Sequence, residues 1–318
     1  MRKSLFFFFL IVSVFYANAS DYEVVDIYRN DLENFGFRGK VDSVIHITGK
    51  PGKDLESFSD AMFYSETFLQ FNDNGFCSFI RFKDLASDEV TVENVFSYHS
   101  RNGKRLMFAI YGRDSVEIFR KVFRYDSNGK VTKEEITYPR KSSKPSDTVD
   151  YIYDESGNPV KKITVRNATG RQRSAETFSY GANGLLLGKE TVTFADRGKT
   201  KKTVEQWEYN SAGQKTAYRI SAENKIRETE YTYTEDGKIY EEIRYEDGKQ
   251  LSRKVYHYEK GVCAAELVSD GEDRLTSITR LSYDQKGNWI QKIMYRFGEN
   301  SKRVEVYQIE KREIRYRR

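Results

Sequence analysis

Apolar and polar residues alternate along most of the chain with a period of two, and short polar turns interrupt the alternation. The segment "YIYDESGNPV" (151–160) shows the pattern: two rings two residues apart, then an acid, small polar residues and a glycine. Side chains two residues apart lie on one face of an extended strand, so this pattern predicts β-strands rather than helices. The phrase returns as "FRYDSNGKV", "LSYDQKGNWI" and "YTYTEDGKIY".

A glycine marks each of these turns, and its positions reveal a repeat with a period of 24 to 29 residues. The turn glycines are Gly75, Gly103, Gly129, Gly157, Gly184, Gly213, Gly237, Gly261 and Gly287. A nearly constant spacing of this size is typical of repeat architectures. Aspartate binds nearby backbone groups and glycine adopts the left-handed conformation that a short hairpin needs. We therefore assign a structural turn role to Asp126, Gly129, Asp154, Gly157, Asp284 and Gly287.

Each unit reads as one β-hairpin, because a second, looser turn follows the second strand. About nine such units would give about eighteen strands in one long antiparallel meander. Open twisted sheets rarely exceed roughly ten strands without curling or splitting. The predicted fold class is therefore all-β, with the sheet curled into a spiral or barrel-like shell.

Four regions follow from the pattern. Residues 1–19 combine a basic head, a short apolar run and small residues before Ala19, which predicts a cleaved secretory signal peptide and export to the periplasm or surface of a bacterium. Residues 20–62 are expected to form an N-terminal cap and residues 63–300 the hairpin repeats. Residues 301–318 are expected to form a charged C-terminal capping strand, whose charges would protect an exposed sheet edge, although binding of an anionic polymer is an alternative.

The charge balance narrows the classes of partner. The chain has 53 Lys and Arg against 48 Asp and Glu, a formal net charge of +5. Mixed charge argues against a nucleic-acid binder, which would carry a field of one sign. In "GKIYEEIRYEDG" charged side chains fall on both faces of a predicted strand, which a lipid-facing strand would not tolerate. We therefore expect no nucleic-acid partner and no membrane insertion after signal cleavage.

Residues that carry chemistry are sparse. The three histidines, His46, His99 and His257, show no metal-ligand spacing, and the chain has no nucleophile elbow and no phosphate loop. We expect no metal, no cofactor and no catalytic activity. Acidic residues are numerous, so an exported hydrolase that uses two turn carboxylates is the alternative.

The two cysteines, Cys77 and Cys263, each stand two residues after a turn glycine. Other units place apolar residues there, which favours small buried side chains over a disulfide. A disulfide needs Cα atoms within about 7 Å, so bonding these two residues would require the sheet to close on itself.

Three aromatic residues, Trp207, Tyr209 and Trp289, are the candidate binding residues, because such rings can stack on sugars. Packing in the core is the competing interpretation, since Trp207 occupies the repeat's own aromatic position. The expected function is an exported, non-catalytic scaffold that binds a glycan or an envelope protein. A purely structural envelope protein is a further alternative.

The segments "YIYDESGNPV" and "LSYDQKGNWI" resemble the YD repeat of RHS-type proteins, whose usual phrase is Tyr-x-Tyr-Asp-x-x-Gly-Asn. The segment "FRGKVDSVIHITGKP" (37–51) resembles the opening of secreted YD-repeat proteins from Bacteroidetes-type bacteria. The resemblance covers roughly residues 65 to 300 and implies a β-shell fold with a loose association with sugar binding. Larger members enclose a toxin domain, and no segment here resembles that toxin or its autoprotease, so the resemblance does not imply an encapsulating role.

Overall fold

The computed structural model describes residues 32, 35–52, 61–99, 103–195, 198–298 and 304–318. The predicted signal peptide, residues 1–19, and the segment 20–31 lie outside these ranges. In the described ranges the secondary-structure elements are twenty β-strands, β1 to β20.

The first ten strands are β1 (Val41–Lys50), β2 (Met62–Phe71), β3 (Cys77–Asp84), β4 (Glu89–Tyr98), β5 (Arg105–Gly112), β6 (Glu117–Tyr125), β7 (Val131–Thr137), β8 (Asp147–Tyr153), β9 (Pro159–Arg166) and β10 (Arg171–Tyr180). The second ten are β11 (Leu186–Phe194), β12 (Thr200–Tyr209), β13 (Lys215–Ala222), β14 (Lys225–Tyr233), β15 (Ile239–Glu246), β16 (Lys249–Glu259), β17 (Val262–Asp270), β18 (Leu275–Tyr283), β19 (Trp289–Phe297) and β20 (Val304–Tyr316).

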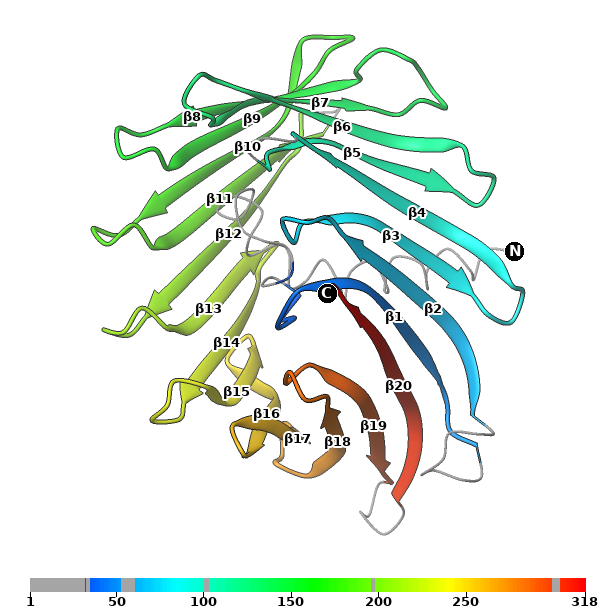
Figure 1. The fold of residues 1–318 in the computed structure, drawn as a ribbon. Helices are drawn as coiled ribbons and strands as arrows, with labels where there is room; N and C mark the ends of the chain where they lie inside the picture. Colours follow the sequence, from blue (N-terminus) through cyan, green and yellow to red (C-terminus); the bar gives the residue numbers. More distant parts are fainter. Residues whose placement is uncertain (1–31, 33–34, 53–60, 100–102, 196–197, 299–303) are drawn as a thin grey trace.

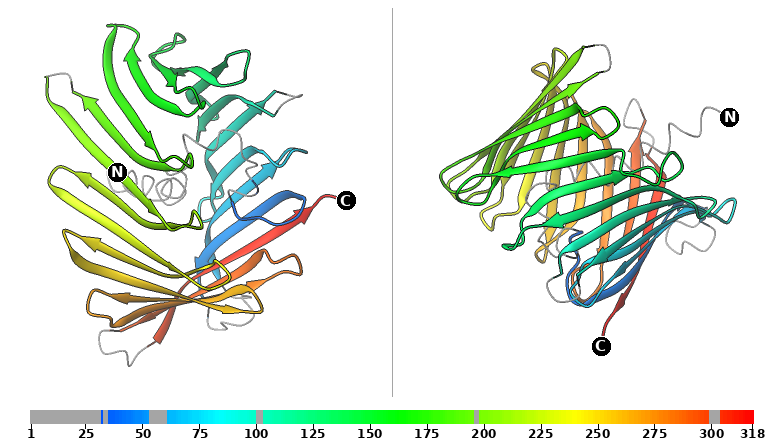
Figure 2. Two further views of the ribbon diagram at one scale, coloured as in Figure 1. Left: turned by 90° about the vertical axis from the view of Figure 1, so that its left-hand side faces the viewer. Right: turned by 90° about the horizontal axis from the view of Figure 1, so that it is seen from above.

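The strands form one closed antiparallel barrel. Each strand pairs with its neighbour in the chain, and β20 pairs with β1, so the 20-stranded sheet has no free edge. Figure 1 shows the meander running from β1 around to β20, and Figure 2 shows β20 lying beside β1. The predicted curled, barrel-like sheet is confirmed, and closure gives every strand two partners.

The nine predicted hairpins account for β2 to β19, with one turn glycine inside each hairpin. The remaining two strands explain why the barrel has twenty strands instead of the expected eighteen. β1 comes from the region predicted as an N-terminal cap, and β20 comes from the predicted C-terminal capping strand. Because β20 pairs with both β19 and β1, its charges do not guard an exposed edge as we expected.

The two aromatic positions of each repeat lie on the same face of their strand, and we call this face the tyrosine face. Most of the buried side chains lie on it, including Leu69, Phe123, Phe178 and Trp207. Side chains crowd together on the concave side of a closed sheet, so the tyrosine face is the inner face of the barrel. A cluster near β1 to β3, which includes Phe37, Val44 and Phe71, forms its largest apolar part.

A ladder of tyrosine hydroxyls joins each hairpin to the one before it. The second ring of a hairpin donates to the backbone carbonyl near the start of the preceding hairpin's second strand, at 2.5 to 3.0 Å. The rungs are Tyr98 to Cys77, Tyr125 to Arg105, Tyr153 to Val131, Tyr180 to Pro159, Tyr209 to Leu186, Tyr233 to Lys215, Tyr258 to Ile239 and Tyr283 to Cys263. Eight of the nine hairpins thus carry a tyrosine whose hydroxyl forms a rung, while the first hairpin has Phe71 at this position and forms none.

The Tyr153→Phe substitution is expected to lower the free energy of unfolding by about 0.5–1.5 kcal/mol, the usual net worth of one hydrogen bond. It removes only the hydroxyl that donates to the Val131 carbonyl at 2.6 Å. Urea denaturation measures the change, and Tyr240→Phe, at a tyrosine that is 46% exposed, is the matched control. Equal effects of the two substitutions would contradict the ladder's role.

The two ends of the described chain together build a tenth unit of the same kind. Tyr316 pairs with Val41 as Tyr125 pairs with Val131 in an intact hairpin. Gly39 has the positive φ of a turn glycine, +82°, and stands two residues before Val41 as Gly129 stands before Val131. The strands β20 and β1 thus reproduce the repeat's geometry as a split hairpin that no covalent turn connects.

Polar contacts at the end of β20 hold this split hairpin in place. Arg317 donates its backbone N–H to the Lys40 carbonyl at 2.9 Å, which is the bond that Asp126 donates to Lys130 in an intact turn. The Arg317 guanidinium also contacts the Phe71 carbonyl and lies 2.8 Å from a carboxylate oxygen of Asp73. We call Tyr316 and Arg317 the C-terminal clamp.

Residues of the last intact turn fix the same clamp from its other side. The Tyr316 hydroxyl donates to the Asp284 carboxylate and accepts a bond of 2.6 Å from the Asn288 side-chain amide. The Asn288 amide group also exchanges two hydrogen bonds with the backbone of Arg38, at 2.6 and 2.9 Å. Asn288 is 2% exposed, so these bonds are buried where both chain ends meet the last repeat.

Candidate functional site

The three candidate binding residues lie in two separate places on the inner face. Trp207 is 4% exposed and packs with Phe178 and Leu186, while its ring centroid lies 5.5 Å from that of Tyr218. Tyr209 forms the ladder rung to the Leu186 carbonyl at 3.0 Å. Packing and hydrogen bonding thus engage these two rings. Trp289 is the candidate residue that lies beside charged side chains.

Trp289, at the start of β19, lies beside one cation from its own strand and one from β20. The Arg312 guanidinium carbon is 3.5 Å from the centre of the indole ring, and the Lys292 Nζ is 4.4 Å from it. His46 meets the ring edge-on at 5.3 Å. The Glu310 carboxylate pairs with the His46 Nε2 at 3.2 Å. We call these five residues the Trp289 cluster.

The cluster carries more positive than negative groups in a largely buried position. His46 and Glu310 side chains are each 13% exposed. Burial lowers the pKa of Lys292, and burial lowers the pKa of Arg312 to about 9. Burial alone would raise the pKa of Glu310, but the hydrogen bond from His46 and the charge of Lys292 outweigh it and hold the pKa below its ordinary value. The surroundings of Glu310 therefore favour its charged form.

A band of acids, lysines and tyrosines continues from this cluster around the inner face, and we call it the inner charge belt. Its contacts are Lys121 to Glu134 at 2.9 Å, Lys162 to Glu176 at 3.9 Å, Lys189 to Glu205 at 2.9 Å, Tyr218 to Glu205 at 2.8 Å, Tyr256 to Glu242 at 3.3 Å and Lys254 to Glu266 at 3.4 Å. A carboxylate that is partly buried needs a cation or a donor beside it, and each acid in the belt has one.

The outer face of the same strands carries its own ion pairs. Examples are Arg219 with Glu228 at 3.0 Å and Arg124 with Glu135 at 2.9 Å. The barrel wall is thus charged on both faces in mid-strand, as the segment "GKIYEEIRYEDG" predicts.

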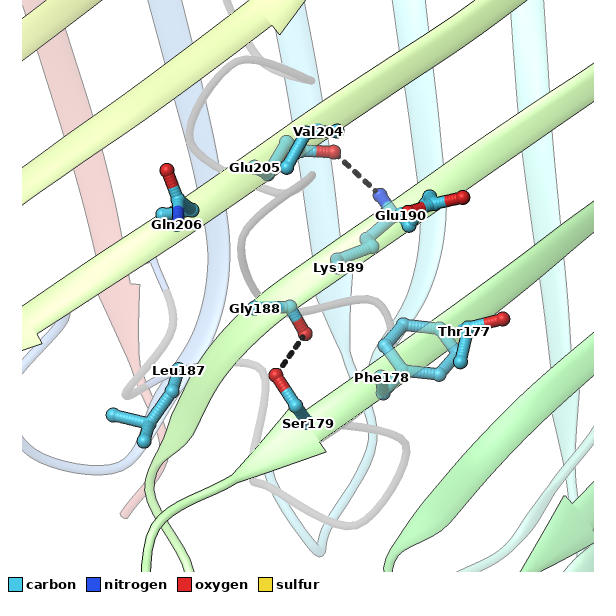
Figure 3. A pocket seen from close by; sticks show the side chains of 10 residues that line it. All are labelled: Thr177, Phe178, Ser179, Leu187, Gly188, Lys189, Glu190, Val204, Glu205 and Gln206. Atoms are coloured by element: carbon cyan, nitrogen blue, oxygen red, sulfur yellow. Dashed lines mark hydrogen bonds and ion pairs between the residues drawn. The ribbon is translucent and has the colours of Figure 1, made fainter.

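A pocket lies over β10, β11 and β12, and Figure 3 shows the side chains that line it. Gly188 pairs with Ser179 on one side and Gln206 on the other, so the wall lacks a side chain between them. The Lys189 and Glu205 side chains form their ion pair from adjacent strands at the same level. The pocket is polar and does not gather the predicted binding rings into one site.

The turn residues occupy the positions that the repeat assigned to them. Gly129, Gly157 and Gly287 have φ of +84°, +90° and +80°. The Asp154 carboxylate accepts from the Asn158 backbone N–H at 2.7 Å, and this hydrogen bond is the main reason why its pKa lies below the ordinary value. An acid held in this way serves the turn.

The two cysteines are free thiols, in β3 and β17. Cys77 is buried and Cys263 is half-buried, and burial raises the pKa of the Cys263 thiol to about 11. Closure of the sheet, which a disulfide required, leaves them six strands apart along the shorter way around the barrel. Each thiol instead donates to a carbonyl of its own strand.

Within the described ranges, no three His, Cys, Asp or Glu side chains come together as a metal ion would require. The part of the chain that the structure describes also contains no helix of the length and apolar character that a bilayer span demands.

The sequence pointed to Trp289 but not to its partners. His46, Lys292 and Arg312 come from three strands, and β1 and β20 are about 260 residues apart in the chain. The signal that could have found them is the half-motif at each end: "GKV" at 39–41 matches the residues after a turn, and "IRY" at 314–316 matches those before one.

Comparisons with known proteins give loose likenesses. No protein-family model matches the chain, and no curated protein matches it. The barrel is similar to a porin-like protein from Bacteroides uniformis, with a TM-score of 0.36 and 10% identity over 86% of this chain and 98% of that one. It is also similar to the TcdB2-TccC3-Cdc42 and TcdB2-TccC3-TEV structures, with TM-scores of 0.30 and 0.29 and 10% identity.

The likeness is loose. The chain covers 17% and 15% of the length of those two chains, with 78% and 72% of its own residues aligned.

Proposed function

We propose that this protein is an exported, non-catalytic β-barrel scaffold that binds a glycan on its inner face. The observation that carries the proposal is the Trp289 cluster, where an aromatic ring, two strong cations and a histidine converge beside a single carboxylate. A few charged and polar groups held in fixed positions beside an aromatic ring can orient a ligand and distinguish its substituents. Export rests on the predicted signal peptide.

The state of the acids supports a non-catalytic role. A glycoside hydrolase needs one carboxyl group whose pKa is raised, so that it can give a proton to the leaving group. Among the described residues, the acids whose pKa departs clearly from the ordinary value all depart downward, from Asp88 and Glu134 to Asp284 and Glu310. A lowered pKa keeps these carboxyl groups charged, so they are unsuited to donate a proton, which disfavours the hydrolase alternative.

The outer face gives a reason to propose no membrane insertion. Ion pairs such as Arg253 with Glu241 and Lys133 with Asp150 stand in mid-strand, and a lipid-facing band would be apolar. A water-facing exterior and a recognition site on the interior are the properties of an envelope scaffold.

A binding screen tests the proposal. The chain from residue 20 onward is immobilised and exposed to a glycan array and to a bacterial envelope extract. We expect capture of one glycan class, weakened at least tenfold by Lys292→Gln and unchanged by Arg219→Gln, which removes the same charge from the outer face. Capture of envelope proteins without glycans would replace this proposal by an assembly role. Capture of nothing from either the glycan array or the extract would favour a purely structural protein.

A further inference from the structure

Arg312 combines a buried guanidinium, two neighbouring aromatic rings and an unbonded donor atom on the inner face. Its guanidinium carbon lies over two rings, 3.5 Å from the centre of Trp289 and 4.8 Å from the centre of Phe37. Its Nε is buried and has no hydrogen-bond acceptor among the described residues. A buried donor without an acceptor costs roughly 1–3 kcal/mol, and more when it is charged, so a native protein rarely keeps one without a use.

The position of the guanidinium over two rings decides what such a group can bind. An aromatic ring contacts a guanidinium through its π face and does not use the N–H groups in the guanidinium plane. Those N–H groups match the oxygens of a carboxylate, sulfate or phosphate in pairs. The two rings also fix the orientation of the fork before the ligand arrives, which reduces the entropy lost on binding.

The charges around Arg312 add to the same preference. Lys292 and Lys254 contribute further positive charge from β19 and β16, while Glu310 and Glu266 contribute the negative charge. Glu310 is already engaged, since it pairs with His46 at 3.2 Å and accepts from the Gln308 amide at 2.8 Å. Three strong cations therefore face two carboxylates, and the excess is one positive charge before any contribution from His46.

We propose that the Trp289 cluster is an oxyanion-binding site, in which the Arg312 fork and the Lys292 ammonium hold a carboxylate, sulfate or phosphate group. This inference deepens the proposed function, on which its biological meaning rests: the glycan would be an acidic one. Trp289 then supports the guanidinium and does not itself stack on a sugar, because Arg312 already covers the ring.

The experiment follows the fluorescence of Trp289 in a Trp207→Phe background, where it is the remaining tryptophan of the 2 in the chain. Sodium sulfate, glucuronate and glucose are titrated at a constant ionic strength set with chloride. We expect saturable changes with sulfate and glucuronate and none with glucose. Arg312→Gln is expected to weaken both at least tenfold, and Arg312→Lys, which keeps the charge but loses the fork, by a smaller factor.

Arg219→Gln is the matched control, since it removes one arginine charge from the outer face. Equal weakening by Arg219→Gln and Arg312→Gln, or no saturable response to sulfate or glucuronate in the parent chain, would overturn the inference. If Arg312→Gln does not fold, as circular dichroism would show, Lys292→Gln takes its place with the same expectation. Glycan capture without anion binding would contradict this inference but leave the proposed function intact. Anion binding without glycan capture would contradict the proposed function but leave this inference intact.

Discussion

Deletion of residues 316–318 is expected to lower the melting temperature by about 10 °C and to open the barrel between β20 and β1. The deletion removes the Tyr316 bonds to Asp284 and Asn288 and the Arg317 contacts with Phe71 and Asp73. At about 1 kcal/mol for each hydrogen bond, with more for the charged ones, the loss sums to roughly 3–5 kcal/mol. A loss of 1 kcal/mol shifts the melting temperature by about 2–4 °C in proteins of this size class.

Hydrogen exchange locates the effect. Amides of β1 and β20 should lose protection before those of β8 to β14, because the split hairpin is the only neighbouring pair with no short covalent connection among the described strands. Deletion of the exposed Arg318 alone is the control and should leave stability within about 0.5 kcal/mol. Protection of β1 and β20 that survives the longer deletion would show that the clamp does not hold the seam.

Glu134→Gln is expected to cost roughly 3–5 kcal/mol, the usual price of breaking a buried ion pair from one side. Glu134 is 4% exposed and lies 2.9 Å from the Lys121 Nζ, and it accepts a hydrogen bond from Tyr151. The substitution keeps the shape but leaves Lys121 without this anion. Urea denaturation measures the loss.

The neighbouring residue supplies a control within the same strand. Glu135 points to the outer face, is 29% exposed and pairs with Arg124 at 2.9 Å. Exposed pairs contribute about 0–1 kcal/mol, so Glu135→Gln should change stability far less than Glu134→Gln. If the two substitutions cost the same, the inner charge belt does not have the structural role assigned to it.

The pH dependence of the Glu134 effect has a definite sign. Burial alone would raise the pKa of Glu134, but the charges of Lys121 and Lys162 and the bond from Tyr151 hold it below the ordinary value of 4.5. A group whose pKa is lower in the folded state stabilises the fold fully above the unfolded value and loses that contribution as the pH falls through the folded value. The stability gap between the parent and Glu134→Gln should therefore narrow below about pH 4.5, as thermal melts at several pH values would show.

The hairpins could be predicted from sequence because their information is local. A pair such as Phe123 and Tyr125, followed by Asp126 and Gly129, specifies strand, face and turn within seven residues. The same local information explains why Trp207 packs in the wall, since it occupies the first aromatic position of its unit.

Closure and the Trp289 cluster could not be predicted in the same way, because both depend on residues far apart in the chain. Val41 and Tyr316 are paired in the barrel, yet each end carries only half of the repeat's motif. A count of turn glycines therefore finds nine units and misses the tenth. The ladder also required the structure, since alternation places the Tyr153 ring on a face but does not show which carbonyl its hydroxyl meets.

The split hairpin has a consequence for the connectivity of the molecule. In an intact turn three residues connect Tyr125 to Gly129 covalently. In the split hairpin, the backbone hydrogen bond from Arg317 to Lys40 is made without such a connection between Tyr316 and Gly39. In topological terms the barrel is a closed ring of ten hairpin units, and the two chain ends lie within one of them. The pairing between strands does not determine which unit contains the ends. A chain permuted to begin at another turn would preserve the strand order around the ring, so the order of the barrel belongs to its repeat and not to where its ends lie.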